Sequence, residues 1–288
     1  MRPAEPSRTA QMAALARGLH RQLHRPPLVF DDPYAIPLIG PGWTDLDAAL
    51  DHVFPQEVKH AAIAFVVARS RYTEQRLEYG TFTQYVILGA GLDSFGWRRP
   101  DALTRLTVYE IDHPATQAWK KQRAEIVALP RDHRHAFAPI DFETQSLREG
   151  LQAAEFDWAA PTLFAWLGVA PYLTAEAITA TLETIATAGP GSEVVLTYAT
   201  SGPPPDDVSR RFIDLLKGVA EQSGEPLVTF WSPDEAEQMI TRCDLKVADH
   251  PDAAVLIARY FAAREDGLRP QTVERLLTAT VPTPSHGD

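Results

Sequence analysis

The stretch Val86-Ile87-Leu88-Gly89-Ala90-Gly91-Leu92-Asp93 decides the fold of this 288-residue sequence. A short apolar run that ends abruptly in glycine is typical of a buried parallel strand followed by a tight turn. Glycine allows the turn and lets backbone N–H groups approach a ligand closely. We therefore expect a strand to end at Leu88 and a binding loop to follow it.

An acidic residue follows this loop at the sequence spacing that is typical of nucleotide-binding folds. The next apolar run, 106–109, leads into Glu110-Ile111-Asp112, which places Asp112 21 positions after Gly91. In nucleotide-binding α/β folds, an acid at the end of the second strand accepts hydrogen bonds from ribose hydroxyls. Loop and acid together predict a nucleoside-containing cofactor. The alternative is a tight turn that binds nothing.

The residues of the loop also indicate which class of cofactor it binds. A dinucleotide fingerprint requires a third glycine where this chain has Ser94. The carboxylate of Asp93 would repel a pyrophosphate, whereas the sulfonium and amino groups of S-adenosylmethionine are cationic. No tyrosine has a lysine four residues later, and Leu92 stands where a hydrolase elbow needs glycine. S-adenosylmethionine and methyl transfer are therefore favoured over a nicotinamide oxidoreductase.

Apolar runs recur along the chain and alternate with segments of helical periodicity. Strands are expected at 84–88, 106–109, 136–140, 162–166 and 193–198, and helices at 8–25, 57–79, 114–128 and 174–188. This alternation predicts a parallel, doubly wound sheet. Two late runs, 245–248 and 254–260, are separated by a short turn and would form an antiparallel hairpin. The expected class is α/β, Rossmann-like, with seven mostly parallel strands and an antiparallel terminal hairpin.

Three regions follow from this reading. Residues 1–80 are expected to form an N-terminal helical lid, 81–265 the cofactor-binding domain, and 266–288 a C-terminal tail that is frayed at its end. The proline-rich segment 201–205 is read as a stiff loop inside the domain, because strands are predicted on both sides of it.

Composition excludes several classes of function. A net charge of −11 disfavours a nucleic-acid substrate. No apolar stretch approaches the roughly 18–20 residues of a membrane span, and no signal peptide is evident. A single cysteine, Cys243, excludes an internal disulfide and indicates a reducing compartment. We expect a cytoplasmic protein with a small-molecule substrate. The sequence does not indicate an oligomeric state.

Three motifs in fixed order resemble the leucine carboxyl methyltransferase family. They are Ala68-Arg69-Ser70-Arg71-Tyr72, the run from Gln84 to Asp93, and Tyr109-Glu110-Ile111-Asp112-His113-Pro114. The resemblance extends from Phe30-Asp31-Asp32-Pro33-Tyr34-Ala35 to Tyr172-Leu173-Thr174, and more thinly to Tyr198. It implies a class I methyltransferase fold. Because the family includes many bacterial and polyketide-pathway O-methyltransferases, it also implies a small-molecule acceptor of natural-product metabolism.

The resemblance also implies a set of residues that contact the cofactor. They are Arg17, Arg69, Gly89, Ala90, Gly91, Asp93, Asp112, Asp141, Phe142 and Leu167. Arg69 would pair with the carboxylate of the methionine moiety, Asp112 would bind the ribose, and Asp141 with Phe142 would contact the adenine. Arg17 would be the basic residue of the lid. The alternatives are a surface arginine for Arg69 and a helix N-cap for Asp141.

Leu167 departs from the family pattern, in which a glutamate usually follows the fourth strand. An apolar residue at this position suggests a different or more apolar methyl acceptor. The alternative is a protein that binds the cofactor or a metabolite without transferring a methyl group. A carboxylate acceptor, slightly preferred here over a phenol or alcohol, is ionised at neutral pH and needs no base. If a base is used, His113 is a candidate, and Tyr172 and Tyr198 are candidates for lining the acceptor pocket. The alternatives are a structural histidine and core tyrosines.

The N-terminal helix carries the densest basic cluster: Arg17, His20, Arg21, His24 and Arg25. This cluster is either a solvated helix face or a face turned toward a ligand. His20 with His24, and His133 with His135, have no cysteine or glutamate at ligand spacing. We therefore expect surface histidines and no metal site.

Overall fold

The computed structural model describes residues 7–140 and 145–283. Its sheet runs in the order β3-β2-β1-β4-β5-β8-β7, with the short β6 paired to β5. The strands are β1 (Gln84–Leu88), β2 (Thr107–Asp112), β3 (His135–Pro139), β4 (Thr162–Trp166), β5 (Glu193–Thr200), β6 (Phe230–Trp231), β7 (Lys246–Asp249) and β8 (Glu274–Thr280). The pairs within β1–β6 are parallel, whereas β8 is antiparallel to both β5 and β7. The predicted α/β class, a mostly parallel sheet with an antiparallel end, is confirmed.

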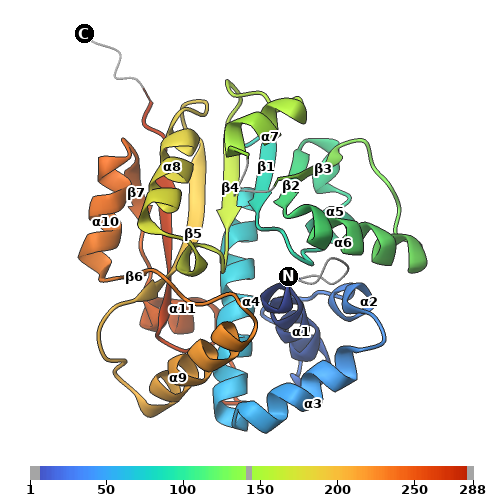
Figure 1. Cartoon of the computed structure of the whole chain (residues 1–288), viewed down its shortest axis with the longest axis vertical. Coiled ribbons are helices and arrows are strands. Elements are labelled where there is room, and N and C mark those ends of the chain that lie inside the picture. The colour runs from blue at the N-terminus through green and yellow to red at the C-terminus, as the bar shows by residue number, and fades with distance from the viewer. Residues whose placement is uncertain (1–6, 141–144, 284–288) are drawn as a thin grey trace.

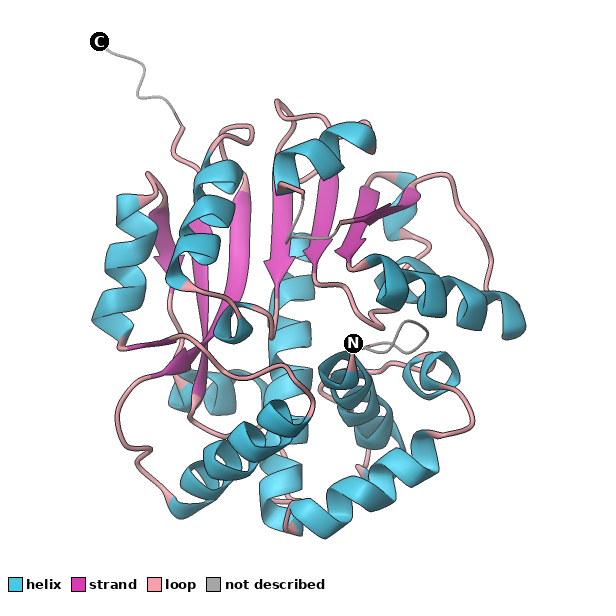
Figure 2. Ribbon diagram, viewed as in Figure 1, coloured by secondary structure: helices cyan, strands magenta, loops and turns pink. Residues whose placement is uncertain are grey.

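Helices flank this sheet and extend beyond the carboxyl ends of its strands (Figure 1, Figure 2). They are α1 (Arg8–Leu23), α2 (Ala35–Ile39), α3 (Trp43–Val53), α4 (Gln56–Tyr79), α5 (Phe95–Arg98), α6 (Pro114–Ile126), α7 (Leu147–Ala153), α8 (Ala175–Ala186), α9 (Asp207–Gln222), α10 (Pro233–Arg242) and α11 (Ala253–Tyr260). Two short 3-10 segments, η1 (Ala102–Thr104) and η2 (Ala170–Tyr172), lie in the connections. In the described residues no helix is both long and apolar enough to span a membrane.

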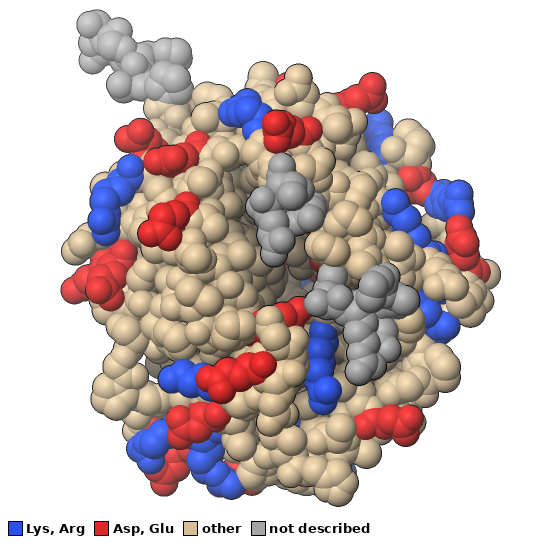
Figure 3. Space-filling view, viewed as in Figure 1, with Lys and Arg blue, Asp and Glu red and all other residues tan. Residues whose placement is uncertain are grey.

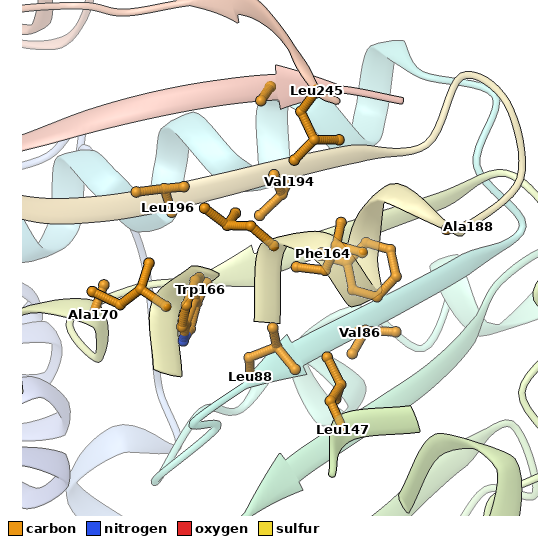
Figure 4. Close-up of a cluster of buried hydrophobic side chains, with 14 of the residues drawn as sticks. Val86, Leu88, Leu147, Phe164, Trp166, Ala170, Ala188, Val194, Leu196 and Leu245 are labelled. Carbon is orange, nitrogen blue, oxygen red and sulfur yellow. The ribbon is translucent and has the colours of Figure 1, made fainter. Parts of the chain in front are cut away.

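Alternate residues of each strand pack against different helix layers. Val86, Phe164 and Val194 face the layer that contains α7, α8 and α10, as the side chains drawn in Figure 4 show. Ile87 and Leu163 face α4, α5 and α11. Because both faces of the parallel strands are covered, the strands read as continuous apolar runs rather than as an alternation.

The N-terminal helices form a cap over the carboxyl ends of the strands (Figure 1). A separate apolar cluster joins α1, α2, α3, the first half of α4, and α9. The 24-residue α4 continues from this cap onto the sheet, where Tyr72 and Leu77 are buried. The cap is therefore held in place by α4 on one side and includes α9, a segment from the later part of the chain.

The prediction of a strand at 254–260 is wrong. Ala253–Tyr260 is α11, whose N-terminus is capped by the Asp252 carboxylate accepting the Val255 N–H at 2.9 Å. Leu256 is buried while Val255 is 37% exposed, so this apolar run has one covered helical face. A short apolar run does not by itself distinguish a strand from a helix. Here Leu256 packs in the cluster that contains residues of α4 and α5, and Asp252 caps the helix.

The strand that pairs with β7 comes from residues 266–288, the region predicted to be a C-terminal tail that is frayed at its end. Glu274–Thr280 lies inside the sheet between β5 and β7, and Leu276, Leu277 and Ala279 are fully buried. β8 pairs with β5 along its whole length, and its last three residues, 278–280, also pair with β7. Residues 274–280 therefore complete the core of the sheet.

Candidate functional site

The glycine loop after β1 has the conformation that its sequence predicts. Gly89 and Gly91 have φ angles of +65° and +50°, which side-chain-bearing residues rarely adopt. The N–H of Ala90 donates to the carbonyl of Ile111 at 3.0 Å and so ties the loop to β2. A Cβ on Gly89 would lie 2.3 Å from Cγ2 of Val169, so the space beside this glycine is filled.

Replacing Gly89 with alanine should therefore disrupt the loop. A left-handed alanine costs about 1–2 kcal/mol, and Val169 would also have to move. We expect Gly89→Ala to lower the melting temperature and to weaken binding of S-adenosylhomocysteine at least tenfold in calorimetry. Gly191→Ala is the matched control, because Gly191 has a φ of +80° with open space around its Cβ. Equal cofactor affinities in the two variants would contradict the role of the loop.

Asp112 lies at the end of β2, beside this loop. Its carboxylate accepts the backbone N–H of Gly91 and, at 2.7 Å, the N–H of His113. Burial raises the pKa of Asp112 above its ordinary value, although these two N–H donors act in the opposite direction. The ionised carboxylate keeps lone pairs for further donors, which is the chemistry that ribose hydroxyls require.

The raised pKa of Asp112 predicts a pH dependence of binding. A ribose bound by the carboxylate stabilises the ionised form, so affinity should fall as pH decreases through the pKa of the free protein. Calorimetry with S-adenosylhomocysteine from neutral to acid pH should show this loss. Asp112→Asn, which has no carboxylate to protonate, should bind weakly with a flatter profile. If wild type and Asp112→Asn lost affinity over the same range of acid pH, a group other than Asp112 would be responsible for the pH dependence.

A cavity of about 1120 Å³ extends from the glycine loop to the cap. The molecule is hollowed near the centre of the face drawn in Figure 3. The polar end of the cavity is formed by the loop and the ends of β1, β2 and β4. Its apolar walls come from α1, α3, α4 and α9, and include Met12, Leu50, Phe54, Val66, Phe212 and Leu216. One chamber thus offers a polar section beside the strands and an apolar section under the cap.

An opposite pair of charges lies deep in this chamber. Nη1 of Arg69, on α4, is 3.5 Å from Oε1 of Glu274, at the start of β8, and both side chains are largely buried. Gly168 lies against the Arg69 guanidinium, because a Cβ there would be 2.8 Å from Nη1. Tyr172 and Leu167 line the same chamber. Burial raises the pKa of Tyr172, so its hydroxyl stays protonated at neutral pH.

Arg17 connects the cap to the glycine loop. Its Nε donates to Oδ2 of Asp32 at 2.8 Å and its Nη2 to the carbonyl of Leu92 at 2.7 Å. Oδ1 of Asp32 also accepts the hydroxyl of Ser94 at 2.7 Å. All three side chains are buried, and Arg17 holds the pKa of Asp32 below its ordinary value despite burial. The predicted lid arginine therefore lines the cavity and fixes the cap to the loop.

The remaining predicted site residues fall into three groups. Ala90, Asp93 and Leu167 line the cavity, whereas Asp141 and Phe142 lie outside the described residues. Tyr198 is not among the residues that line this chamber. It belongs to the core cluster that contains α8 and α10, and its hydroxyl is 2.8 Å from Nε2 of His250.

Hydrogen bonds with neighbouring parts of the protein are formed by His20, His113 and His135. His113 lines the cavity, but its Nδ1 accepts the N–H of Ala115 at 3.2 Å, which makes it the N-cap of α6. The prediction that His20 and His135 are surface residues is wrong: His20 is fully buried and accepts the N–H of Val29, and His135 contacts Glu110 at 2.8 Å. Among the described residues, no cluster of three or more histidine, cysteine or acidic side chains is arranged to hold a metal ion.

The basic cluster of α1 is divided between interior and solvent. Arg17 and His20 are buried, whereas Arg21 and Arg25 are exposed. Only part of this helix face is therefore solvated, and Arg17 alone among these residues lines the cavity.

Sequence reasoning did not identify the two acids that face the arginines of this site, Asp32 beside Arg17 and Glu274 beside Arg69. Oδ1 of Asp32 accepts the N–H groups of Tyr34 and Ala35, both at 3.1 Å. Asp32 also contacts Arg17 and Ser94, which are distant from it along the chain, so no short-range sequence pattern predicts these contacts. Glu274 was placed in the tail. The apolar run that follows it, Leu276-Leu277, was the available sign of a strand there.

Comparisons with known proteins identify a family for this chain. The model of the leucine carboxyl methyltransferase family matches residues 10–186, more than half of the chain. YktD of Bacillus subtilis, whose name assigns it provisionally to the S-adenosyl-L-methionine-dependent methyltransferases, is 29% identical over 292 residues, covering 93% of this chain and 95% of its own. A Frankia alni protein with the same provisional assignment is 33% identical over 209 residues, covering 70% and 67% of the two chains.

Solved structures support the fold. A protein from Thermobifida fusca, provisionally named a methyltransferase, superposes with a TM-score of 0.63 at 15% identity, covering 97% of this chain and 96% of its own. A DUF574 family protein from Streptomyces avermitilis gives a TM-score of 0.63 at 13% identity, with 97% and 99% coverage. Since these identities are low, the two structures show a shared fold alone. The match over residues 10–186 carries the assignment further: the chain belongs to the leucine carboxyl methyltransferase family, and it is a methyltransferase that depends on S-adenosylmethionine.

Proposed function

We propose that this protein is an O-methyltransferase whose acceptor is a small molecule with an apolar body, a substrate of the kind found in natural-product metabolism. The observation that carries the proposal is the single chamber of about 1120 Å³, which joins the glycine loop to apolar walls from α1, α3, α4 and α9. Such a chamber can bury an apolar acceptor next to the cofactor and exclude water from both.

The residues at the polar end of the chamber fit S-adenosylmethionine. Asp112 offers a carboxylate for ribose hydroxyls, and Gly89 with Gly91 allows the backbone to approach the ligand closely. Arg69 is buried with a single ion pair among the described residues, at 3.5 Å, so its guanidinium has donors left for a carboxylate. When bound, the cofactor supplies a methyl group on a positively charged sulfur.

The charges in the chamber favour a hydroxyl acceptor over the carboxylate that the sequence alone slightly preferred. Lys59 is paired with Asp47 and Asp51, both at 2.5 Å, and Arg17 is paired with Asp32. A carboxylate acceptor would lose its hydration beside these cations, which already face carboxylates. Arg8, which also lines the chamber, is exposed at the start of α1. A phenol or alcohol would incur a much smaller penalty on entry, and the protonated Tyr172 hydroxyl could orient it.

The proposal is tested with matched pairs of acceptors, each pair an aromatic carboxylic acid and a phenol with the same ring system. Formation of S-adenosylhomocysteine is measured, and we expect turnover with phenols to exceed turnover with the acids. Turnover with the acids alone would restore the carboxylate alternative. Tight cofactor binding without turnover on either class would instead support a protein that binds without transferring methyl.

The apolar wall should determine the affinity for the acceptor. Phe212, on α9, is 5% exposed and lines the chamber. Phe212→Ala should leave a gap in the wall beside the acceptor, so KM for an accepted phenol should rise about tenfold, the equivalent of about 1.4 kcal/mol, while the affinity for S-adenosylhomocysteine stays unchanged. Ile126→Ala, which truncates a 61% exposed side chain on α6, is the control. An unchanged KM in Phe212→Ala would place the acceptor elsewhere.

A further inference from the structure

Glu274 is the acid of the chamber that lies beside a cation. The acids among the described lining residues are Asp93, Asp112, Glu225 and Glu274. Asp93 accepts the N–H of Phe95, and Asp112 accepts the N–H groups of Gly91 and His113.

Glu225 accepts the hydroxyls of Ser7 and Thr9 at 3.1 and 2.9 Å, which ties its loop to the N-terminus of α1. Glu274, in contrast, faces the Arg69 guanidinium and accepts a hydrogen bond from Nε2 of Gln271 at 3.0 Å.

The contact between Arg69 and Glu274 is looser than the contacts that Arg17 and Arg76 make with their carboxylate partners. Their closest approach is 3.5 Å, compared with 2.8 Å for Arg17 with Asp32 and 2.6 Å for Arg76 with Glu193. The side chains of Arg69 and Glu274 are nevertheless only 9% and 13% exposed. Charges buried to this degree are costly unless hydrogen bonds satisfy them fully, so the pair has capacity for a further charged ligand.

Electrostatics support this interpretation of the pair. Burial lowers the pKa of Arg69 and raises that of Glu274, even though each charge favours the ionised form of the other. Both charges are thus incompletely compensated within the protein. A ligand that brings one positive and one negative group would compensate both of them.

We propose that Glu274 binds the ammonium group of the methionine end of the cofactor, beside the carboxylate on Arg69, so that the ion pair recognises this zwitterion as a unit. The inference rests on the proposed role of Arg69. The ammonium and carboxylate sit on one carbon atom and therefore present opposite charges side by side, as Arg69 and Glu274 do. Leu167, at the end of β4, lines the same chamber with an apolar side chain, so the acid comes from β8 instead.

Calorimetry with two ligands tests the proposal. S-adenosylhomocysteine carries the zwitterion, whereas 5′-methylthioadenosine has the same nucleoside and thioether without it. We expect Glu274→Gln to weaken S-adenosylhomocysteine about 10- to 100-fold, the loss for a hydrogen bond to a charged group, and to leave 5′-methylthioadenosine within twofold of wild type. Asp112→Ala, which acts at the ribose, should weaken both ligands equally.

A second, more conservative variant tests the same role in case Glu274→Gln fails to fold. Glu274→Asp keeps the charge and shortens its reach, and should give an intermediate, equally selective loss. Equal losses for both ligands in the Glu274 variants, or no loss, would overturn the proposal. Wild-type protein that binds S-adenosylhomocysteine no more tightly than 5′-methylthioadenosine would overturn it as well. Failure of wild type to bind either ligand would instead overturn the cofactor site itself.

Discussion

Asp112→Ala should reduce the affinity for S-adenosylhomocysteine about 100-fold or more. Two charge-assisted hydrogen bonds to the ribose hydroxyls would be lost, each contributing about 1.5–3 kcal/mol. The variant also releases the Gly91 N–H, which donates to the Asp112 carboxylate, so the loop itself becomes less ordered. Both effects act in the same direction, and calorimetry on wild type and variant measures their sum.

Two further variants separate binding from folding in this experiment. Asp112→Asn keeps the shape and the acceptor oxygen but removes the charge, and should retain part of the affinity. Asp101→Ala removes an exposed acid that pairs with Arg99 outside the chamber, and should bind as wild type does. If Asp112→Ala is folded by thermal melting and binds within twofold of wild type, the assignment of Asp112 to the ribose is wrong.

Lys120→Met should destabilise the fold by about 3–5 kcal/mol, the loss found when one partner of a buried ion pair is removed. Lys120 and Glu110 are paired with both side chains fully buried, and His135 contacts the other oxygen of Glu110 at 2.8 Å. A loss of this size is a large fraction of the free energy of unfolding of a typical domain. Unfolding in denaturant measures it, and Lys121→Met is the control on the exposed neighbour, which lies over the Phe137 ring.

The pH dependence of this loss follows from the pKa of Glu110. Burial alone would raise that pKa, but Lys120 and His135 hold it below its ordinary value. Glu110 therefore stabilises wild type above its unfolded pKa, and this contribution is lost as pH falls through the folded pKa. In Lys120→Met the unpaired carboxylate is most costly at neutral pH, so the difference between variant and wild type should shrink as pH falls. A difference that is constant with pH would show that lost packing, rather than charge, is responsible.

The sequence by itself predicted the parts of the fold that local patterns encode. The strand that ends at Leu88, the positive-φ glycines after it, and Asp112 at the end of β2 all follow from short-range signals. Each depends on residues that are neighbours along the chain or on a spacing that the βαβ unit imposes. For the same reason the parallel order of β1–β5 could be expected from the alternation of strands and helices.

Only the tertiary structure decided what depends on distant contacts. It made 254–260 a helix and placed β8 between β5 and β7, because apolar runs of that length fit either state until packing partners are present. It also brought Glu274 to Arg69 across 205 positions (274 − 69), and Asp32 to Ser94 across 62. No local sequence pattern predicts such long-range contacts, because burial and charge pairing depend on the folded chain as a whole. The sequence indicated which cofactor this protein uses, and the packing of α4, α9 and β8 around the strand ends formed the chamber in which we propose that this cofactor meets its acceptor.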